Sequence, residues 1–230
     1  MPVGVLVDAF AIFLGGLLGW RIGGKVQKNT REYLTVIFGF CASAIGINSI
    51  VKVSAMAPVI LAVVLGSLIG DLIHLEEKIQ SFAGAALRKL PQQGHTDMDQ
   101  LLTVIVLFCF SGFGIYGTFL SSMSGDHSVL LSKSVLDCFT ALVFAISLGM
   151  PVMLISIPTV VVMLIMFGVG KLIAPLMTET MLRDFMACGG ILTLAAGMRV
   201  AGIKKTAIAN MIPALALVLP FSALWSLLPF

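Results

Sequence analysis

Residues 124–149 read SGDHSVLLSKSVLDCFTALVFAISLG, and they change from a polar connection to a long apolar run. A carboxylate, Asp137, stands just before that run, three residues after Ser134. An ionised group in hydrocarbon costs at least roughly 2.5–3.5 kcal/mol, so Asp137 requires a local partner, a water-filled cavity or a function. Which of these applies depends on the class of protein to which the chain belongs.

The whole chain is too apolar for a soluble domain. Of its 230 residues, 59% are hydrophobic and only 11% are charged, and the mean hydropathy is +1.09. Average globular domains carry about 25% charged residues. Apolar windows recur from end to end, and no polar block is large enough to fold separately. We therefore predict an all-α polytopic membrane helix bundle, with residues 1–230 forming one integral domain.

Charge and cysteine content exclude several classes of function. The net charge of +3 is spread over separate connections, which argues against a nucleic-acid partner. The four cysteines stand singly in apolar stretches without metal-ligand spacing, so we expect no metal and no cofactor. The N-terminal run lacks a preceding Lys or Arg and contains Asp8, which favours a first membrane span over an export signal.

Apolar windows of membrane-spanning length predict eight spans, with seven as the alternative. The weakest division lies in the continuous 135–172 region, where Pro151 and Pro158 would break a helix. With eight spans and both termini on the periplasmic side, ten of the 14 Lys and Arg residues fall on the cytoplasmic side, which mildly favours eight. The predicted spans are 3–23, 34–51, 57–75, 101–121, 133–149, 152–173, 184–201 and 207–228.

Two segments of the chain resemble each other weakly, as in transporters built from duplicated halves. A shift of 151 residues places Gly39 on Gly190 and Gly46 on Gly197. The suspected units, 1–75 and 151–228, would form an inverted three-helix repeat under the eight-span topology and a parallel one under seven. The longest connection between spans, 76–100, is expected on the cytoplasmic side; it begins as an amphipathic helix and continues as a polar Pro-Gln-Gln-Gly link.

Polar residues in or beside the spans are the candidates for solute or ion binding. Asp8 and Asp137 occur in similar settings, VDAFAIF and LDCFTALVF, and could line an outward-facing vestibule that binds a cation or carries a proton. The alternative is that each carboxylate caps the first turn of its helix. The complete set of candidate solute- or ion-binding residues is Asp137, Asp8, Asn48, Asn210, Asp126 and Lys133.

Polar groups near the ends of the spans also have structural explanations. Asn48 and Asn210 lie beside Gly or Pro, which permits local unwinding, but they could equally hydrogen-bond a neighbouring helix. Asp71, His74 and Glu76 form a cluster near the end of a span that could relay protons or could simply be interfacial.

Glycines at every fourth position indicate close helix packing. Gly15, Gly19 and Gly23 form one stripe, and Gly66 with Gly70 forms a second pair. The pattern does not identify the neighbouring helix, so association into a homo-oligomer through these stripes stays open beside packing within the chain.

Three stretches carry a resemblance to a known family. FCFSGFGIYGTFLSSMSGDHSVLLSKSVLDCFTALVFAISLG, GGILTLAAGMRVAGIKKTAIANMIPALALVLP and AIFLGGLLGWRIG resemble the YqgA-like bacterial inner-membrane proteins, a family with a domain of unknown function numbered 554. The resemblance implies a multi-pass inner-membrane protein and supplies no substrate or catalytic residue. Many family members have Asn where this chain has Asp8, so the resemblance gives Asp8 less weight than Asp137.

The sequence therefore predicts a small-solute or ion transporter whose partners are the lipid bilayer and an unknown solute or ion. A non-transporting scaffold or regulatory subunit that binds a partner protein is the alternative. We do not expect an enzyme, because no H-E-x-x-H or G-x-S-x-G pattern occurs.

Overall fold

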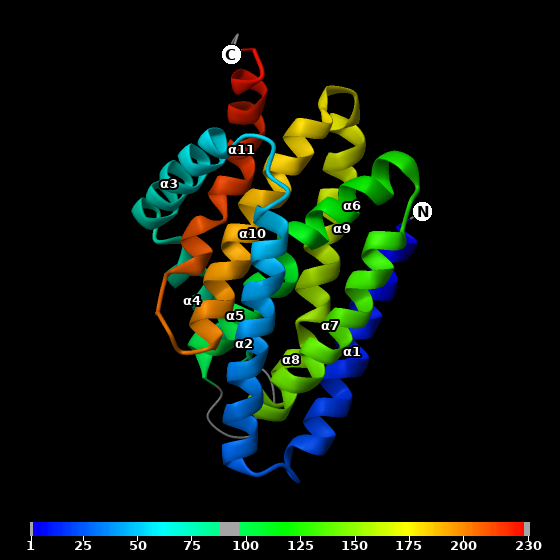
Figure 1. The fold of residues 1–230 in the computed structure, drawn as a ribbon. Coiled ribbons are helices and arrows are strands. Elements are labelled where there is room, and N and C mark those ends of the chain that lie inside the picture. The colour runs from blue at the N-terminus through cyan, green and yellow to red at the C-terminus, as the bar shows by residue number, and fades with distance from the viewer. Residues whose placement is uncertain (1, 88–96, 228–230) are drawn as a thin grey trace.

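The computed structural model describes residues 2–87 and 97–227, which form a bundle of helices (Figure 1). No strand occurs among these residues, so the predicted all-α class is confirmed. The helices are α1 (Val3–Gly23), α2 (Lys28–Ile50), α3 (Met56–Leu72), α4 (Leu75–Leu87), α5 (Met98–Cys109), α6 (Gly112–Ser124), α7 (Ser128–Leu148), α8 (Pro151–Leu154), α9 (Ser156–Ile173), α10 (Glu179–Val200) and α11 (Pro213–Trp225), with 3-10 helices η1 (Ala174–Leu176) and η2 (Ile208–Met211).

Seven helical segments in the described part of the chain are long and apolar enough to cross a membrane. A bent pair, α3 with the Leu75–Phe82 part of α4, makes an eighth if the pair counts as one span. Two of the seven combine helices: Met98–Ser124 joins α5 and α6, and Pro151–Leu176 joins α8, α9 and η1. The prediction of seven or eight spans is confirmed, and the segments follow the order of the predicted windows.

The outer surface of the bundle is covered by large apolar side chains. Phe10 on α1, Phe139 on α7 and Ile165 on α9 are among the exposed ones. Helices that are apolar on their outer as well as their inner faces are stable only where a bilayer covers them. These residues therefore face lipid.

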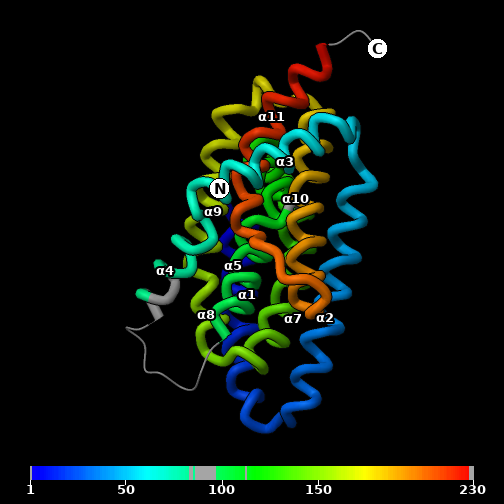
Figure 2. The backbone as a smooth tube through the Cα atoms, turned by 90° about the vertical axis from the view of Figure 1, so that its left-hand side faces the viewer, coloured from blue at the N-terminus to red at the C-terminus, as the bar shows by residue number. Residues whose placement is uncertain are grey.

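Three helix pairs organise the bundle (Figure 1). Along α1 and α7 the residue numbers of touching positions rise together, from Gly15 against Cys138 to Gly23 against Ile146, so these helices are parallel. On α3, Gly66 lies against Ala214 of α11, whereas Gly70 lies against the earlier residue Asn210, so that pair is antiparallel. Figure 2 shows α3 beside α11, with α4 on the flank of the bundle.

The third pair, α2 with α10, is antiparallel and joined through glycines on both helices. A Cβ on Gly39 would lie 2.7 Å from the carbonyl oxygen of Gly197, and a Cβ on Gly46 would lie 2.7 Å from that of Gly190. The two helices approach this closely because neither has a side chain at the crossing. The same four glycines matched in the repeat comparison, but the repeat itself stays a prediction.

The two glycine stripes also have their neighbours within the chain. Gly19 of the first stripe touches α7 at Leu142, and Gly66 of the second touches α11. The faces of α1 and α3 that carry these glycines are therefore covered by helices of the same molecule.

Four connections in the described part of the chain contain a residue with positive φ, and two of these residues lie at sharp changes of chain direction. His74, between α3 and α4, has φ 51°, and the two helices meet at a bend of 60°. Gly149, between α7 and α8, has φ 78°, which ends α7 before Pro151 begins the next helix. The helix predicted at the start of the 76–100 connection is present as α4, whereas the Pro-Gln-Gln-Gly link lies outside the described residues.

Candidate functional site

Three ionisable side chains meet inside the bundle where α1 and α7 lie side by side. Nζ of Lys133 lies 3.1 Å from Oδ2 of Asp8 and also contacts Oδ2 of Asp137. The exposed fractions of the side chains are 3% for Lys133, 0% for Asp8 and 12% for Asp137. Lys133 and Asp137 are four residues apart and so share one face of α7. We call Asp8, Lys133 and Asp137 the buried triad.

The glycine stripe of α1 makes this meeting possible. A Cβ on Gly15 would lie 2.0 Å from the carbonyl oxygen of Cys138, and one on Gly19 would lie 2.1 Å from that of Leu142. These distances are shorter than any real contact of a Cβ, so only glycine permits this spacing of the two helices. The close approach brings Asp8 within hydrogen-bonding distance of a lysine 125 positions later in the chain.

A further glycine, on α6, makes room for the lysine side chain. A Cβ on Gly114 would lie 2.5 Å from Cε of Lys133. Gly114 belongs to the first turn of α6, where its N–H donates to Oγ of Ser111, the N-cap residue. The stem of Lys133 thus passes directly over the start of α6, just after the break between α5 and α6.

Neither carboxylate of the triad is a helix cap. Asp8 is the sixth residue of α1, and Asp137 is the tenth of the 21 residues of α7, because α7 begins at Ser128 and not at the predicted residue 133. Neither helix has a side-chain hydrogen bond at its N-cap. The alternative drawn from the sequence, that each Asp caps a first turn, is therefore wrong. Both carboxylates bind a lysine inside the protein.

Two further polar groups complete the surroundings of the triad. Sγ of Cys109, the last residue of α5, lies 3.4 Å from Oγ1 of Thr159 on α9. Cys109 is fully buried and lies within electrostatic range of all three members of the triad. Cys109 of α5 and Thr159 of α9 therefore form a buried polar contact within electrostatic range of the triad.

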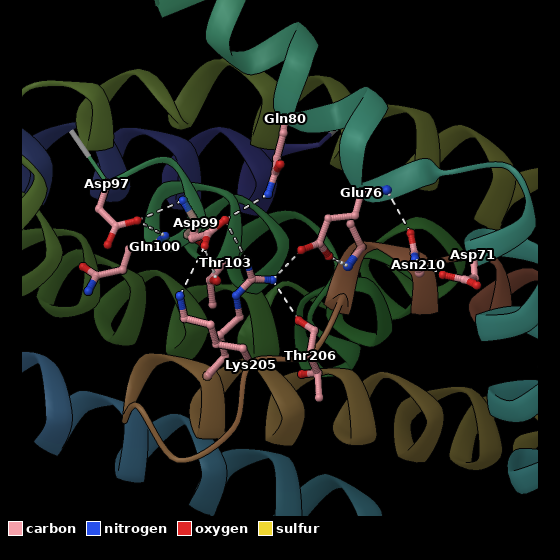
Figure 3. A network of polar contacts seen from close by, with 12 residues as sticks. Asp71, Glu76, Gln80, Asp97, Asp99, Gln100, Thr103, Lys205, Thr206 and Asn210 are labelled. Carbon is pink, nitrogen blue, oxygen red and sulfur yellow. Dashed lines mark hydrogen bonds and ion pairs between the residues drawn. The ribbon is translucent and has the colours of Figure 1, made fainter. Parts of the chain in front are cut away.

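A second polar cluster lies where α4, α5, α10 and η2 meet (Figure 3). Nη1 of Arg199 donates to Oε1 of Glu76 at 2.7 Å and to the carbonyl oxygen of Thr206 at 2.9 Å. Nη2 of Arg199 lies 3.4 Å from Oδ1 of Asp99, which also accepts from Gln80 at 3.1 Å. This arginine therefore holds four segments together.

Asn210 extends the same cluster toward α3. Its Oδ1 accepts from the backbone N–H of Glu76 at 2.9 Å, which caps the start of α4, and its Nδ2 donates to Oδ1 of Asp71 at 3.2 Å. The sequence had grouped Asp71 and Glu76 with His74. In the structure the Asp71 carboxylate accepts from Asn210, and the Glu76 carboxylate binds Arg199. His74 is exposed, and its Nδ1 lies 3.8 Å from Oε1 of Glu77.

The remaining two candidates lie apart from the triad. Asn48 is exposed near the end of α2. Asp126 is exposed between α6 and α7, where the backbone N–H of Ser128 donates to its Oδ1 at 2.9 Å. That hydrogen bond lowers the pKa of the Asp126 carboxyl below its ordinary value. Its role in the structure is that of a turn residue before α7.

One buried carboxylate was not a candidate from the sequence. Oδ1 of Asp184, on α10, accepts from the backbone N–H groups of Ser54 and Ala55 at 2.9 and 2.8 Å. Its Oδ2 accepts from Oγ of Ser222 on α11 at 2.6 Å. Asp184 therefore caps α3 from a neighbouring helix. Asp184 stands at the start of the predicted span 184–201, and this position gave no signal of a partner 130 residues away.

A cavity of about 530 Å³ lies near the start of α2. The start of α2 is at the lower end of the bundle in Figure 1. Its wall includes Thr35 and Ser147, whose hydroxyl oxygens lie 3.0 Å apart. The cavity is lined by Lys28, Arg31, Glu32, Thr35, Val36, Gln100, Ser147, Val200, Ala201 and Gly202.

The helices and the buried triad define a multi-pass membrane protein with charged groups inside its spans. The chain belongs to the family described as "Protein of unknown function (DUF554)", whose model matches residues 3–223. This confirms the resemblance seen in the sequence, and the match includes every member of the triad.

Two relatives match over nearly their whole length. The chain is 40% identical over 232 residues to "Uncharacterized protein YqgA" of Escherichia coli (strain K12), covering 98% of each chain. It is 24% identical over 216 residues to "Uncharacterized membrane protein YdfK" of Bacillus subtilis (strain 168), covering 92% of each. No solved structure matches the chain.

Proposed function

We propose that this protein moves a small solute or an ion across the bacterial inner membrane and uses the buried triad to bind an ion. The observation that carries the proposal is the meeting of three ionisable side chains inside the spans, each almost completely shielded from solvent. Charges in such a place are expensive, and in membrane proteins they mark ion pathways and proton relays. Nothing in the proposal requires enzymatic chemistry.

The proposed orientation follows from the positive charges. The α1–α2 connection and the segment after α10 lie at the same end of the bundle, because α2 and α10 are antiparallel and the cavity beside Lys28 is also lined by Ala201 and Gly202. Positive charge is favoured on the cytoplasmic side, so we place this end there and both chain termini in the periplasm. The Lys and Arg residues in these two segments and in the adjoining ends of α1, α2 and α10 are Arg21, Lys25, Lys28, Arg31, Arg199, Lys204 and Lys205.

The test is flux through purified full-length protein in liposomes, with a panel of inorganic ions and small metabolites. We expect flux of at least one of them, and we expect Asp137→Asn to abolish it. Asp126→Asn is the matched control, because Asp126 is exposed and its carboxylate accepts from the backbone N–H of Ser128 in the turn before α7. Absence of flux for the whole panel, or equal flux in the Asp137→Asn and Asp126→Asn proteins, would overturn the proposal.

One observation favours the alternative, a scaffold or regulatory subunit. Phe82 on α4 is 78% exposed, and α4 lies on the flank of the bundle (Figure 2). An exposed aromatic on an amphipathic helix can dock a partner or insert into the membrane surface. Crosslinking from position 82 in cells, followed by mass spectrometry, distinguishes a stoichiometric protein partner from lipid. Because helices of the same chain cover the glycine stripes, homo-oligomers would have to form through other faces.

A further inference from the structure

The buried triad carries one negative charge too many. Lys133 contacts both Asp8 and Asp137, so two carboxylates share one ammonium group. With all three groups ionised, a net charge of −1 would lie where Asp8 is completely buried and Lys133 almost so. An uncompensated charge in such a place costs several kcal/mol, so the triad requires one more positive charge.

The carboxyl oxygens show where that charge is missing. Oδ2 of Asp8 binds Lys133, whereas Oδ1 of Asp8 is fully buried and has no hydrogen-bond partner among the described residues. The side chains of Asp8 and Asp137 also lie close enough to hydrogen-bond with each other. An ionised carboxylate is only an acceptor, so two carboxyl groups can make this bond only when one of them holds a proton.

We propose that Asp8 and Asp137 hold one proton between them, with Lys133 as their fixed counter-ion, and that this proton is the coupling ion of the transporter. The proton would enter from water on one side, convert one carboxylate to a carboxylic acid, and leave to water on the other side. The coupling part rests on the proposed function, whereas the proton site itself stands without it.

The surroundings favour a proton over a metal ion. No group of three or more His, Cys, Asp or Glu side chains in the described ranges could hold a metal, and the Lys133 ammonium already lies between the two carboxylates. A proton needs only one lone pair, and the unpartnered Oδ1 of Asp8 supplies it. The polar groups that adjoin from α5 and α9, Cys109 and Thr159, are a thiol and a hydroxyl and add no positive charge.

The charged and titratable groups on the surrounding helices are few. On Asp137 itself the acting charges are those of Lys133 and Asp8, and Cys109 of α5 is influenced by all three. Other groups on these elements have contacts of their own: Lys171 of α9 lies over the ring of Phe167, Asp99 of α5 pairs with Arg199, His127 contacts Ser121, Glu32 pairs with Lys28, and Arg31 donates to the carbonyl oxygen of Val26. The same elements also carry Arg21, Tyr33, Cys41, Tyr116 and Cys138.

The position of Lys133 suggests how protonation would reach the rest of the fold. When the proton leaves, both carboxylates attract the ammonium group, and when it binds, one attraction weakens. The Lys133 stem lies against Gly114 in the first turn of α6. A shift of the lysine would therefore press on or release the start of α6, next to the break that separates it from α5.

Infrared spectroscopy of full-length protein in lipid nanodiscs tests the proton site directly, because a protonated carboxyl group has its own C=O stretching band. At neutral pH we expect one such band from the interior. Asp8→Asn and Asp137→Asn should each remove it, since the remaining carboxylate then pairs one-to-one with Lys133. Lys133→Met should increase it about twofold, because both carboxyls then stay neutral. Asp126→Asn should leave it unchanged.

The outcomes separate the two proposals. Absence of the band in unmodified protein, its persistence in either Asp→Asn variant, or its loss on adding Na⁺ at fixed pH would overturn the proton site. If an Asn variant does not fold, the proton site is tested by the unmodified protein alone, through the presence of the band and its persistence when Na⁺ is added. If the band is present but liposomes show no flux, the transport proposal is overturned and the proton site stands. If flux occurs without the band, the proton site is overturned and the transport proposal stands.

Discussion

Arg199 and Glu76 are 123 positions apart, yet Nη1 of the arginine lies 2.7 Å from Oε1 of the glutamate. The two side chains are 8% and 13% exposed. Oε2 of the same glutamate accepts from the backbone N–H of Ala209 at 3.0 Å, so the pair ties α10 to both α4 and η2 (Figure 3). Removing one partner of an ion pair shielded to this extent lowers the stability of the fold considerably, because the other charge is left buried and unpaired.

Arg199→Gln should therefore lower the free energy of unfolding by roughly 3 kcal/mol. Glu76→Gln should have a comparable effect, and the double variant should lose less than the sum of the two. The measurement is unfolding of the purified protein in detergent, followed by circular dichroism.

The matched control for this pair is Arg183→Gln. Its partner Glu179 is also on α10, but the two side chains are 54% and 78% exposed, so we expect a change below about 1 kcal/mol. Equal stability of the Arg199 and Arg183 variants would contradict the structural role assigned to Arg199.

Gly19→Ala should disturb the packing of α1 on α7. The added Cβ would lie 2.1 Å from the carbonyl oxygen of Leu142, so the helices must separate. We expect a loss of about 1–3 kcal/mol in stability, as for overpacked cores, and weaker binding between Asp8 and Lys133. Thermal unfolding in detergent measures the first effect, and liposome flux measures the second.

Gly24→Ala is the control for this substitution. Gly24 follows α1 directly, has a right-handed helical conformation and has nothing within 4 Å of an added Cβ. Its replacement should change stability by no more than about 0.5 kcal/mol. A Gly24 variant as unstable as the Gly19 variant would show that the contact with α7 does not explain the loss.

Asp184→Ala should release the start of α3. It removes the acceptor for the partly buried N–H groups of Ser54 and Ala55 and for the buried hydroxyl of Ser222, at a cost of about 1–3 kcal/mol. Asp184→Asn keeps one carbonyl oxygen and should cost less. Hydrogen exchange of the first turn of α3 measures the effect locally. Exchange that is unchanged in the Ala variant would exclude this capping role.

The sequence predicted the spans well because bilayer thickness sets their length locally, and each apolar window carries its own signal. The pairing of Lys133 with Asp137 could also have been predicted from the sequence, since their spacing places them on one face of a helix. That Asp8 joins them depends on how α1 packs against α7. The glycine stripe of α1 predicted a closely packed neighbouring helix but did not identify that helix as α7.

Other features had no local signal at all. Asp184 and Glu76 find their partners in distant segments, so no spacing rule could reveal them. The contrast between Asp126 and Asp137 is instructive, since both were candidates within one stretch. The first is an exposed turn residue, and the second reaches the interior because α7 begins at Ser128 and carries it to mid-helix.

Lys133→Met gives the sharpest prediction for the triad. Without the ammonium group, two buried carboxylates face each other, and folding requires both to be neutral. Stability should therefore fall as pH rises, by roughly 3–5 kcal/mol at alkaline pH, and approach that of the unmodified protein at acidic pH. Thermal unfolding in nanodiscs at several pH values measures this.

Lys171→Met removes an exposed lysine from α9 and should show no such pH dependence. Adding Asp8→Asn and Asp137→Asn to the Lys133→Met protein should restore stability at alkaline pH, because no charge is then left to bury. If the single Lys133 variant is as stable as the Lys171 variant at every pH, the carboxylates do not depend on the lysine. If the triple variant fails to recover, packing of the lysine stem against Gly114 matters more than its charge.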